Sequence, residues 1–358
     1  MNGVTLTLFS AERGAADQRR TNNFDALRLV AAVMVVVGHA FILTGAGAPP
    51  AAFGTPIDTL GVYLFFAISG YLIAGSWETV PRISRFFRHR ILRIFPALIA
   101  VILITVFVIG PFASSLGTTR YFRSGETWNY LQGLVLLAQY ELPGVFTAAS
   151  HARTAVNGSL WTLGVEFSCY LGIVVLGLLV PRRWRPLAFV VVAAVAVGGV
   201  AVNGLWTLDK GAFDACRVVP FFALGSVLRL SLPSRLIDWR VSIGLLGIWQ
   251  AAALLWPTSA LFVAWIVVPY AVVALGMGSA PVLRRAARFG DLSYGTYLWA
   301  FLVQQMELDI AGRISLIADI LVTLAITLAV AWLSWHLIER RAIGLASRWR
   351  ATRAHESR

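Results

Sequence analysis

Ten apolar windows, each about 20 residues long, constrain the fold of this chain more than any other feature. A helix of that length crosses the hydrocarbon core of a bilayer, so each window predicts a transmembrane helix. The composition agrees, because 58% of the residues are hydrophobic and only 13% are charged. We therefore predict an all-α polytopic membrane protein, a single bundle of about ten helices. The predicted spans are 24–44, 58–77, 91–111, 159–180, 187–206, 212–230, 241–256, 259–279, 291–310 and 315–338.

The positions of the basic residues predict how the chain is threaded through the membrane. If the N-terminus is cytoplasmic, 23 of the 30 Lys and Arg residues lie in segments that face the cytoplasm. This asymmetry follows the positive-inside rule and accounts for the net charge of +13 without a nucleic-acid partner. We therefore expect cytoplasmic termini, with residues 1–23 as an N-terminal segment, 24–341 as the transmembrane domain and 342–358 as a basic tail. The expected location is the inner (plasma) membrane, which the chain crosses many times.

One long segment, 112–158, is predicted to form an outer loop. Within it, Tyr130–Tyr140 is apolar but too short to cross a bilayer, which indicates a membrane-surface or re-entrant helix. Residues 157–159 read Asn-Gly-Ser and match a glycosylation sequon. Turn and cap chemistry at the start of the next helix is the plainer interpretation of the same residues.

The first predicted helix carries three groups that a lipid-facing helix disfavours: Asp25, Arg28 and His39. Eleven residues make about three helical turns, so Arg28 and His39 lie on nearly the same stripe, about 16 Å apart. Asp25 precedes Arg28 by three residues and shares its face. Ionisable groups inside a span predict a functional site that faces protein or water. The alternative is that Arg28 is a cytoplasmic anchor and His39 lies near the far end of the helix.

A cluster of arginines precedes the third predicted span. Arg90 and Arg93 stand three residues apart on one face of a helix that enters the bilayer. Arginine forms bidentate hydrogen bonds with phosphate, so this pair suits a phosphorylated soluble donor. The alternative is a positive cluster attracted to anionic lipid, which we favour for the neighbouring arginines at 82, 85 and 88.

The candidate substrate-binding residues are Glu166, Trp161, Ser69 and Tyr71. Glu166 lies about two turns into an apolar span, toward the predicted outer side, and needs a partner or a wet cavity. It could contact an acceptor, or it could accept hydrogen bonds from neighbouring Trp or backbone N–H groups. Small residues around Ser69 also predict close packing of helices.

Three further features have simpler explanations. Asp291 follows a glycine at a predicted helix start, where it could be a helix cap. His336 shares a face with Glu339 near the predicted cytoplasmic surface, and a solvated helix end explains it. Cys169 and Cys216 lie in apolar segments, so we predict neither a disulfide framework nor a metal site.

Taken in order, these motifs resemble the acyltransferase 3 family of integral-membrane O-acyltransferases. The matching stretches are FDALRLVAAVMVVVGHA, FFAISGYLI, FFRHRILRIFPAL, NGSLWTLGVEFSCYL, GDLSYGTYLWAF and LSWHLIERR, which run from residue 22 to 341. Each is weak alone, and the ordered set is specific. No SGNH hydrolase domain follows the tenth span, so the resemblance is to the stand-alone form. Many members carry a His where this chain has Ala300, which puts in doubt any mechanism that needs a second His.

The resemblance implies ten helices and transfer of an acyl group, such as acetyl, from cytoplasmic acyl-CoA to a hydroxyl. It implies acceptors that are typically sugars of surface polysaccharides or lipid-linked glycans and sometimes antibiotics. We expect no metal cofactor. The first-helix pair, here Arg28 and His39, is the family's proposed catalytic pair. The R-x-x-R motif, here Arg90 and Arg93, implies binding of CoA phosphate.

We hypothesise that His39 is the general base, because a neutral imidazole suits the deprotonation of a hydroxyl near neutral pH. Arg28, with Asp25, would set its environment or polarise the thioester carbonyl. Direct transfer and an acyl-His39 relay both remain open. The rival interpretations are a transporter, which would show similar midplane charges, and a non-catalytic lipid-binding scaffold.

Overall fold

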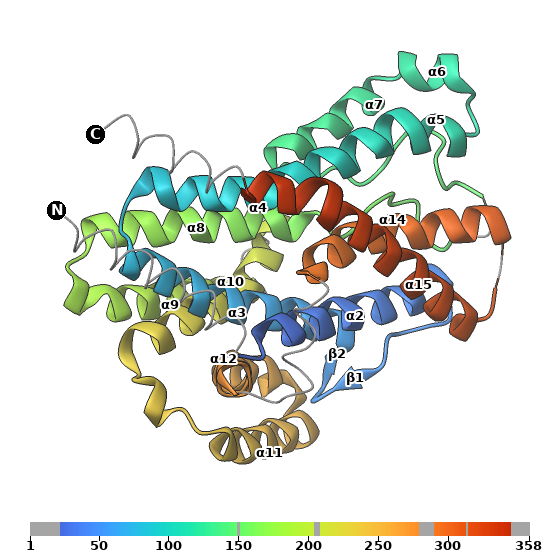
Figure 1. Cartoon of the computed structure of the whole chain (residues 1–358). Helices are drawn as coiled ribbons and strands as arrows, with labels where there is room; N and C mark the ends of the chain where they lie inside the picture. Colours follow the sequence, from blue (N-terminus) through green and yellow to red (C-terminus); the bar gives the residue numbers. More distant parts are fainter. Residues whose placement is uncertain (1–21, 149–150, 204–207, 279–289, 313, 345–358) are drawn as a thin grey trace, which may run out of the picture.

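The computed structural model describes residues 22–148, 151–203, 208–278, 290–312 and 314–344, and it is built almost entirely from helices (Figure 1). A helix lies at each of the ten predicted positions, so the all-helical prediction is confirmed. The long helices are α2 (Phe24–Leu43), α3 (Ile57–Thr79), α4 (Ile83–Ile104), α8 (Trp161–Leu179), α9 (Arg185–Val202), α10 (Lys210–Ser231), α11 (Trp239–Leu255), α12 (Ala260–Met277), α14 (Leu292–Ala311) and α15 (Leu316–Ser334). Most of the N-terminal segment and of the basic tail lies outside the described residues.

Eight helical stretches of the described chain are long and apolar enough to cross a membrane, which is consistent with a polytopic membrane protein. The other two predicted spans differ in character. α11 is apolar but has only 17 residues. α14 has 20 residues and buries four polar side chains, Ser293, Thr296, Gln304 and Gln305, inside the protein.

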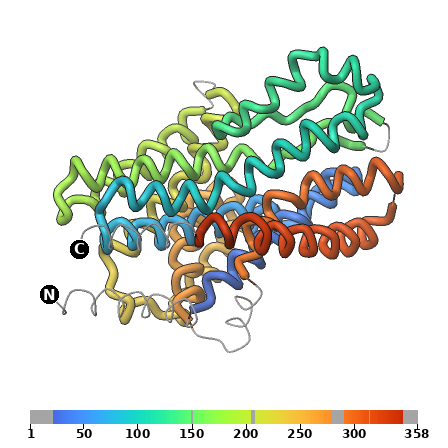
Figure 2. Tube along the Cα trace, turned by 45° about the horizontal axis from the view of Figure 1, so that its top comes forward, coloured from blue at the N-terminus to red at the C-terminus, as the bar shows by residue number. Residues whose placement is uncertain are grey.

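Long apolar helices run side by side along the length of the molecule, as α4 and α8 do in both ribbon views (Figure 2). α3 lies at the centre and packs against α2, α10 and α12. The contact with α10 depends on glycine: a Cβ on Gly70 would collide with the carbonyl oxygen of Phe222, and one on Gly225 would lie 2.5 Å from that of Ala67. The close helix approach predicted around Ser69 is therefore confirmed.

Short elements connect the long helices. After α2, the strands β1 (Ala51–Ala52) and β2 (Thr55–Pro56) form an antiparallel hairpin that sequence analysis did not predict. α4 continues through a π-helical turn, η1 (Thr105–Ile109), into α5 (Gly110–Ala113). The chain then forms α6 (Thr118–Arg123), α7 (Gly125–Asn129) and the 3-10 helix η2 (Tyr130–Val135). The helix expected over Tyr130–Tyr140 thus ends at Val135, because Leu136 adopts a left-handed conformation.

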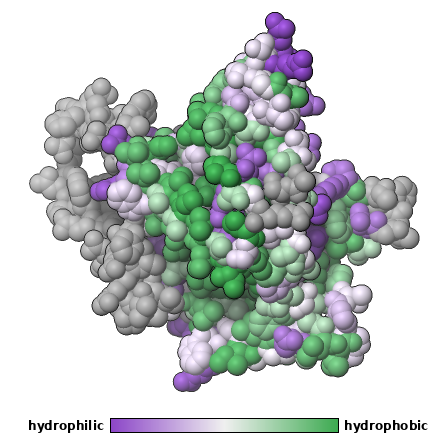
Figure 3. Space-filling model, turned by 90° about the vertical axis from the view of Figure 1, so that its right-hand side faces the viewer, coloured by the Kyte–Doolittle hydropathy of each residue, from purple (hydrophilic) through white to green (hydrophobic). Residues whose placement is uncertain are grey.

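The surface combines apolar and polar regions (Figure 3). Hydrophilic side chains gather at the tip of the projection that α6 and α7 form at the top of this view. Large apolar side chains stand exposed on the outside of the bundle, including Leu178, Leu179 and Val195. Exposed apolar side chains of this kind are typical of helices that face lipid.

The end of the predicted outer loop is fixed to α14. The side chain of His151 is fully buried, with Nδ1 2.9 Å from Oε1 of Gln305 and Nε2 3.2 Å from Oδ1 of Asp309. Gln305 Nε2 also donates to the carbonyl oxygens of Arg153 and Ala155. These bonds hold the segment that leads into α8.

The residues just before α8 form a buried turn. Asn157 is 1% exposed, its Nδ2 donates to the carbonyl oxygen of Leu298, and its Oδ1 accepts the backbone N–H of Ser159. The predicted turn is therefore confirmed, whereas the predicted cap is wrong, because the N-cap residue of α8 is Leu160 and no side chain caps the helix. The turn also brings the start of α8 against α14.

Candidate active site

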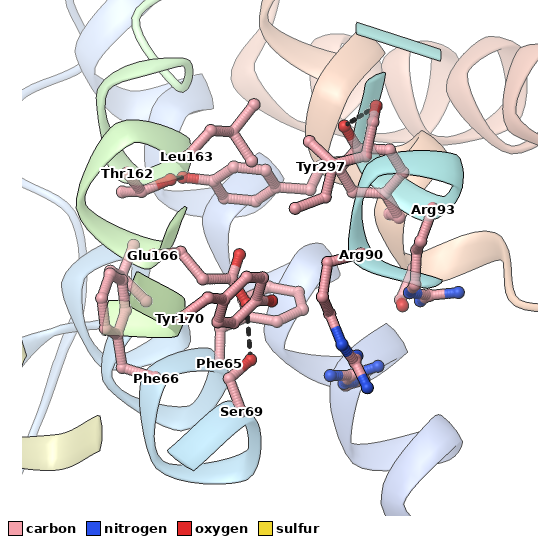
Figure 4. A pocket seen from close by; sticks show the side chains of 15 residues that line it. Phe65, Phe66, Ser69, Arg90, Arg93, Thr162, Leu163, Glu166, Tyr170 and Tyr297 are labelled. Atoms are coloured by element: carbon pink, nitrogen blue, oxygen red, sulfur yellow. Dashed lines mark hydrogen bonds between the residues drawn. The ribbon is translucent and has the colours of Figure 1, made fainter. Parts of the chain in front are cut away.

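Three of the predicted arginines line one cavity, which we call the arginine cavity (Figure 4). It encloses about 690 Å³, including its open mouth, between α2, α3, α4, α8 and α14. Arg28 reaches it from α2, and Arg90 and Arg93 reach it from α4. The other lining residues are Val62, Phe65, Phe66, Ser69, Ile94, Thr162, Leu163, Glu166, Tyr170, Ser293, Tyr294 and Tyr297. The fold thus brings Arg28 and the R-x-x-R pair into one cavity, although they lie far apart in the sequence.

An acidic side chain organises two of these arginines. Asp291 forms an ion pair with Arg93, and its Oδ2 lies 4.0 Å from Nη1 of Arg28. Asp291 sits at the N-cap position of α14, yet its side chain makes no capping hydrogen bond and instead accepts from the Ser293 hydroxyl at 2.6 Å. The cap interpretation is therefore wrong, and Asp291 instead binds arginine.

Arg90 is held differently from Arg93. Its guanidinium lies 5.8 Å from the ring centroids of both Phe86 and Tyr170, within the range of cation–π attraction. Its Nη2 donates to the Ser76 hydroxyl at 3.3 Å, and its Nε is buried without a hydrogen-bond partner. Arg90 therefore keeps donors that no carboxylate of the described chain satisfies, which suits it to an anionic ligand.

Glu166 lies in the arginine cavity at the centre of a hydroxyl network (Figure 4). One carboxylate oxygen, Oε1, accepts from the Ser69 hydroxyl at 2.7 Å and from the Tyr170 hydroxyl at 2.6 Å. Two of the predicted substrate-binding residues, Glu166 and Ser69, are thus in direct contact, although they come from different helices and are 97 residues apart.

A second cavity contains His39, and we call it the histidine cavity. It encloses about 870 Å³, including its open mouth. Its lining residues are Val35, His39, Asp58, Thr59, Val62, Tyr63, Gly158, Ser159, Trp161, Lys210, Asp214, Arg217, Val218 and Tyr297. The wall is strongly polar, with charged groups from α3 and α10, and hydroxyl-rich molecules such as sugars could bind there.

The two cavities share Val62 and Tyr297 in their walls. The Tyr297 hydroxyl lies 2.7 Å from Oγ1 of Thr162 and donates to the carbonyl oxygen of Ser159, so the ring is held in place. Arg28 and His39 therefore lie on the same helix, each in one of two adjacent cavities separated by these two side chains.

The remaining predicted residues divide between the cavities and the core. Trp161 lines the histidine cavity. Tyr71 lines neither cavity: its ring stacks on Phe24 and its hydroxyl contacts the sulfur of Met277. Asp25 is half-buried one turn before Arg28 and also lines neither. Ala300, where a second His was absent, is buried in α14.

Sequence analysis missed Asp58 and Asp214, the two carboxylates that line the histidine cavity with His39. The available signal was their position, because an ionisable residue at the start of an apolar span invites the same question as Glu166. Among the described residues, no group of three or more His, Cys, Asp or Glu side chains has the arrangement of a metal site.

Comparisons with known proteins find one family model and several similar sequences. A family model described as an acyltransferase domain matches residues 21–337. An O-acetyl transferase of Shigella phage Sf6 is 28% identical over 92% of this chain and 98% of its own length. Nodulation protein 10 of Rhizobium leguminosarum bv. viciae is 29% identical over 90% of this chain and 94% of its own length. Acyltransferase MdmB of Streptomyces mycarofaciens is 27% identical over 70% of this chain and 69% of its own length. No solved structure matches the chain significantly.

Proposed function

The chain belongs to the acyltransferase 3 family, and from this premise we propose that it transfers an acetyl group from cytoplasmic acetyl-CoA to a hydroxyl of a surface polysaccharide or lipid-linked glycan. The printed name of the phage relative, an O-acetyl transferase, supports acetyl as the group transferred. Family membership assigns the chain to the acyltransferases, so the transporter and scaffold alternatives are set aside. The proposed location is the inner (plasma) membrane.

One observation carries this proposal: an arginine-rich cavity and a histidine-containing cavity lie back to back, separated by Val62 and Tyr297. An acyl transfer from a polyanionic thioester to a hydroxyl needs a cationic donor site beside a base. This arrangement supplies both, with Arg28 and His39 on one helix.

The arginine cavity is the proposed donor site. CoA carries phosphates, which arginine binds through paired N–H donors. Arg90 and Arg28 each keep a buried Nε without a hydrogen-bond partner, whereas Arg93 is already paired with Asp291. We therefore assign the donor chiefly to Arg90, with Arg28 near the thioester carbonyl, where a cation stabilises the negative charge of the transition state.

The histidine cavity is the proposed acceptor site. His39 takes the proton of the acceptor hydroxyl as that oxygen bonds to the thioester carbon. Trp161 offers an aromatic face to a sugar ring, and Asp214 and Lys210 offer groups that can hydrogen-bond to hydroxyls. Glu166, with Ser69, is proposed to contact the acyl-bearing end of the donor rather than the acceptor, because it lies among the arginines.

The test is acyl transfer by a His39→Ala protein in membranes supplied with labelled acetyl-CoA. We expect CoA release and glycan labelling to fall at least 100-fold, the usual scale for loss of a general base. His336→Ala is the matched control, because His336 lies outside both cavities and bonds the carbonyl oxygen of Trp332. A folded His39→Ala protein with full transfer would reject the proposal. Mass differences in surface glycans between wild-type and deletion cells would identify the acceptor.

A further inference from the structure

Asp58 packs against the residue next to His39 in a contact that only glycine at that position allows. It is the second residue of α3 and faces Gly38 of α2. A Cβ on Gly38 would lie 2.5 Å from the Cβ of Asp58, so any larger residue would force the two helices apart. The glycine therefore lets a carboxylate reach the turn of α2 that carries His39.

His39 and Asp58 each contain a buried polar atom without a hydrogen-bond partner. These atoms are Nδ1 of the imidazole and Oδ1 of the carboxylate. Leaving such an atom unpaired costs about 1–3 kcal/mol, so two in one place call for an explanation. The two atoms are chemically complementary, because a protonated Nδ1 donates and a carboxylate oxygen accepts. Both residues line the histidine cavity.

We propose that Asp58 is the positioning residue for His39. When the acceptor occupies the cavity, Asp58 Oδ1 accepts the hydrogen bond of Nδ1–H. This bond fixes the tautomer in which Nε2 is free to take a proton. Hydrogen bonds of this kind are often open in unliganded enzymes and close in the reacting complex. The ring is already restrained on one side by Phe301, whose centroid lies 5.0 Å away in an edge-to-face contact.

The proposal rests on the proposed function, in which His39 is the base, and the proton balance follows from it. Nε2 takes the acceptor proton while the acceptor oxygen bonds to the thioester carbon. The carbon–sulfur bond then breaks, and Nε2 returns the proton to the sulfur to give the CoA thiol. Nδ1–H stays bonded to Asp58 throughout, and the carboxylate stabilises the transient imidazolium.

Other titratable groups line the same cavity, and their effects on His39 must be distinguished from the effect of Asp58. α10 contributes Lys210, Asp214 and Arg217, and α3 contributes Tyr63, whose hydroxyl accepts from Arg217 at 3.2 Å. From α14, Tyr297 is bonded to Ser159 and Thr162. Asp214 is the rival carboxylate, and it comes from a different helix. If Asp214 were the partner of His39, its replacement would produce the effects predicted for Asp58.

The experiment measures kcat, KM for acetyl-CoA and the pH–rate profile of Asp58→Asn and Asp214→Asn proteins. For Asp58→Asn we expect kcat to fall about 100-fold, with KM for acetyl-CoA changed less than twofold, because the arginine cavity is untouched. The acidic limb of the profile should move to lower pH, since the imidazole loses a neighbouring negative charge. A purely structural loss would lower the rate equally at every pH.

Asp238→Asn is the matched control. Asp238 is an exposed acid at the start of α11, where its Oδ1 accepts from the backbone N–H of Arg240, and it lines neither cavity. Should Asp58→Asn not fold, Asp58→Glu carries the test. It keeps the charge but displaces it by one methylene, and kcat should fall about tenfold.

The outcomes separate the two ideas. An Asp58→Asn protein with wild-type kcat, or with a lower kcat and an unshifted profile, overturns the role of Asp58. For Asp58→Glu, an unchanged kcat does the same. If the shift appears with Asp214→Asn and not with Asp58→Asn, Asp214 is the partner and the proposal is wrong. If His39→Ala itself retains transfer, the proposed function fails instead.

Discussion

The ion pair between Arg93 and Asp291 allows a quantitative prediction, because the two single substitutions leave different charged groups behind. The two side chains are 22% and 14% exposed. Removing one partner of a buried pair costs about 3–5 kcal/mol, and partial exposure places this pair at or below the lower end. After Arg93→Ala, Asp291 keeps the Ser293 hydroxyl and the guanidinium of Arg28 at 4.0 Å. After Asp291→Ala, the guanidinium groups of Arg28 and Arg93 lose the carboxylate that they share, although Glu339 still lies close enough to attract Arg93.

We therefore expect Asp291→Ala to be the more destabilising change. At 4 Å and an effective dielectric constant of about 20, a charge pair is worth about 4 kcal/mol, so Arg28 compensates for part of what Arg93→Ala removes. The expected losses in the free energy of unfolding are about 2 kcal/mol for Arg93→Ala and about 3 kcal/mol for Asp291→Ala. The double variant should be more stable than Asp291→Ala alone, because it removes one of the two cations.

Thermal unfolding of the detergent-solubilised protein, followed by tryptophan fluorescence, measures this order. At about 2 °C per kcal/mol for a chain of this size, the single variants should melt roughly 4 and 6 °C below the wild type. A double variant whose loss equals the sum of the two single losses would refute the reasoning. The same proteins separate the structural role from donor binding: if Arg93 also holds phosphate, KM for acetyl-CoA is higher in the double variant than in Asp291→Ala.

Two further predictions concern the partition and the outer loop. Tyr297→Ala removes one of the two side chains between the cavities, so water should reach the thioester. The rate of CoA release without acceptor should then rise several-fold. An unchanged rate would show that the ring is not a barrier. His151→Ala leaves Oε1 of Gln305 and the carboxylate of Asp309 without their buried partner. The equilibrium constant for opening of that loop should rise about tenfold, which corresponds to about 1.4 kcal/mol. Tryptic cleavage after Arg153 should become faster by the same factor. Equal cleavage rates in both proteins would show that His151 does not hold the loop.

Sequence reasoning predicted the helices well because the bilayer imposes length and polarity on each span independently. Each predicted span is a helix in the structure, although α4 begins eight residues earlier than expected, at Ile83. Periodicity also predicted that Arg28 shares a face with His39, and that Arg90 shares a face with Arg93. Local rules suffice for such features, since they concern one helix at a time.

These local rules could not predict which residues of different helices contact each other. Nothing in the sequence indicates that Asp291 meets Arg93, since 198 residues separate them. Asp291 carries a cap signature that its side chain does not use, so the tertiary ion pair overrode the local propensity. The contact of Asp58 with the turn that carries His39 could not be predicted, because the glycine that allows it lies on another helix, at Gly38. Tyr71 was expected near substrate, yet its neighbours bury it in the core.

The position of Val62 and Tyr297 between the two cavities has a consequence for how an acyl group crosses the membrane. If the arginine cavity opens toward the cytoplasm and the histidine cavity toward the outer side, the acyl group crosses the membrane at these two side chains. The space that Val62 and Tyr297 leave between the two cavities would then limit how bulky an acyl group can be delivered.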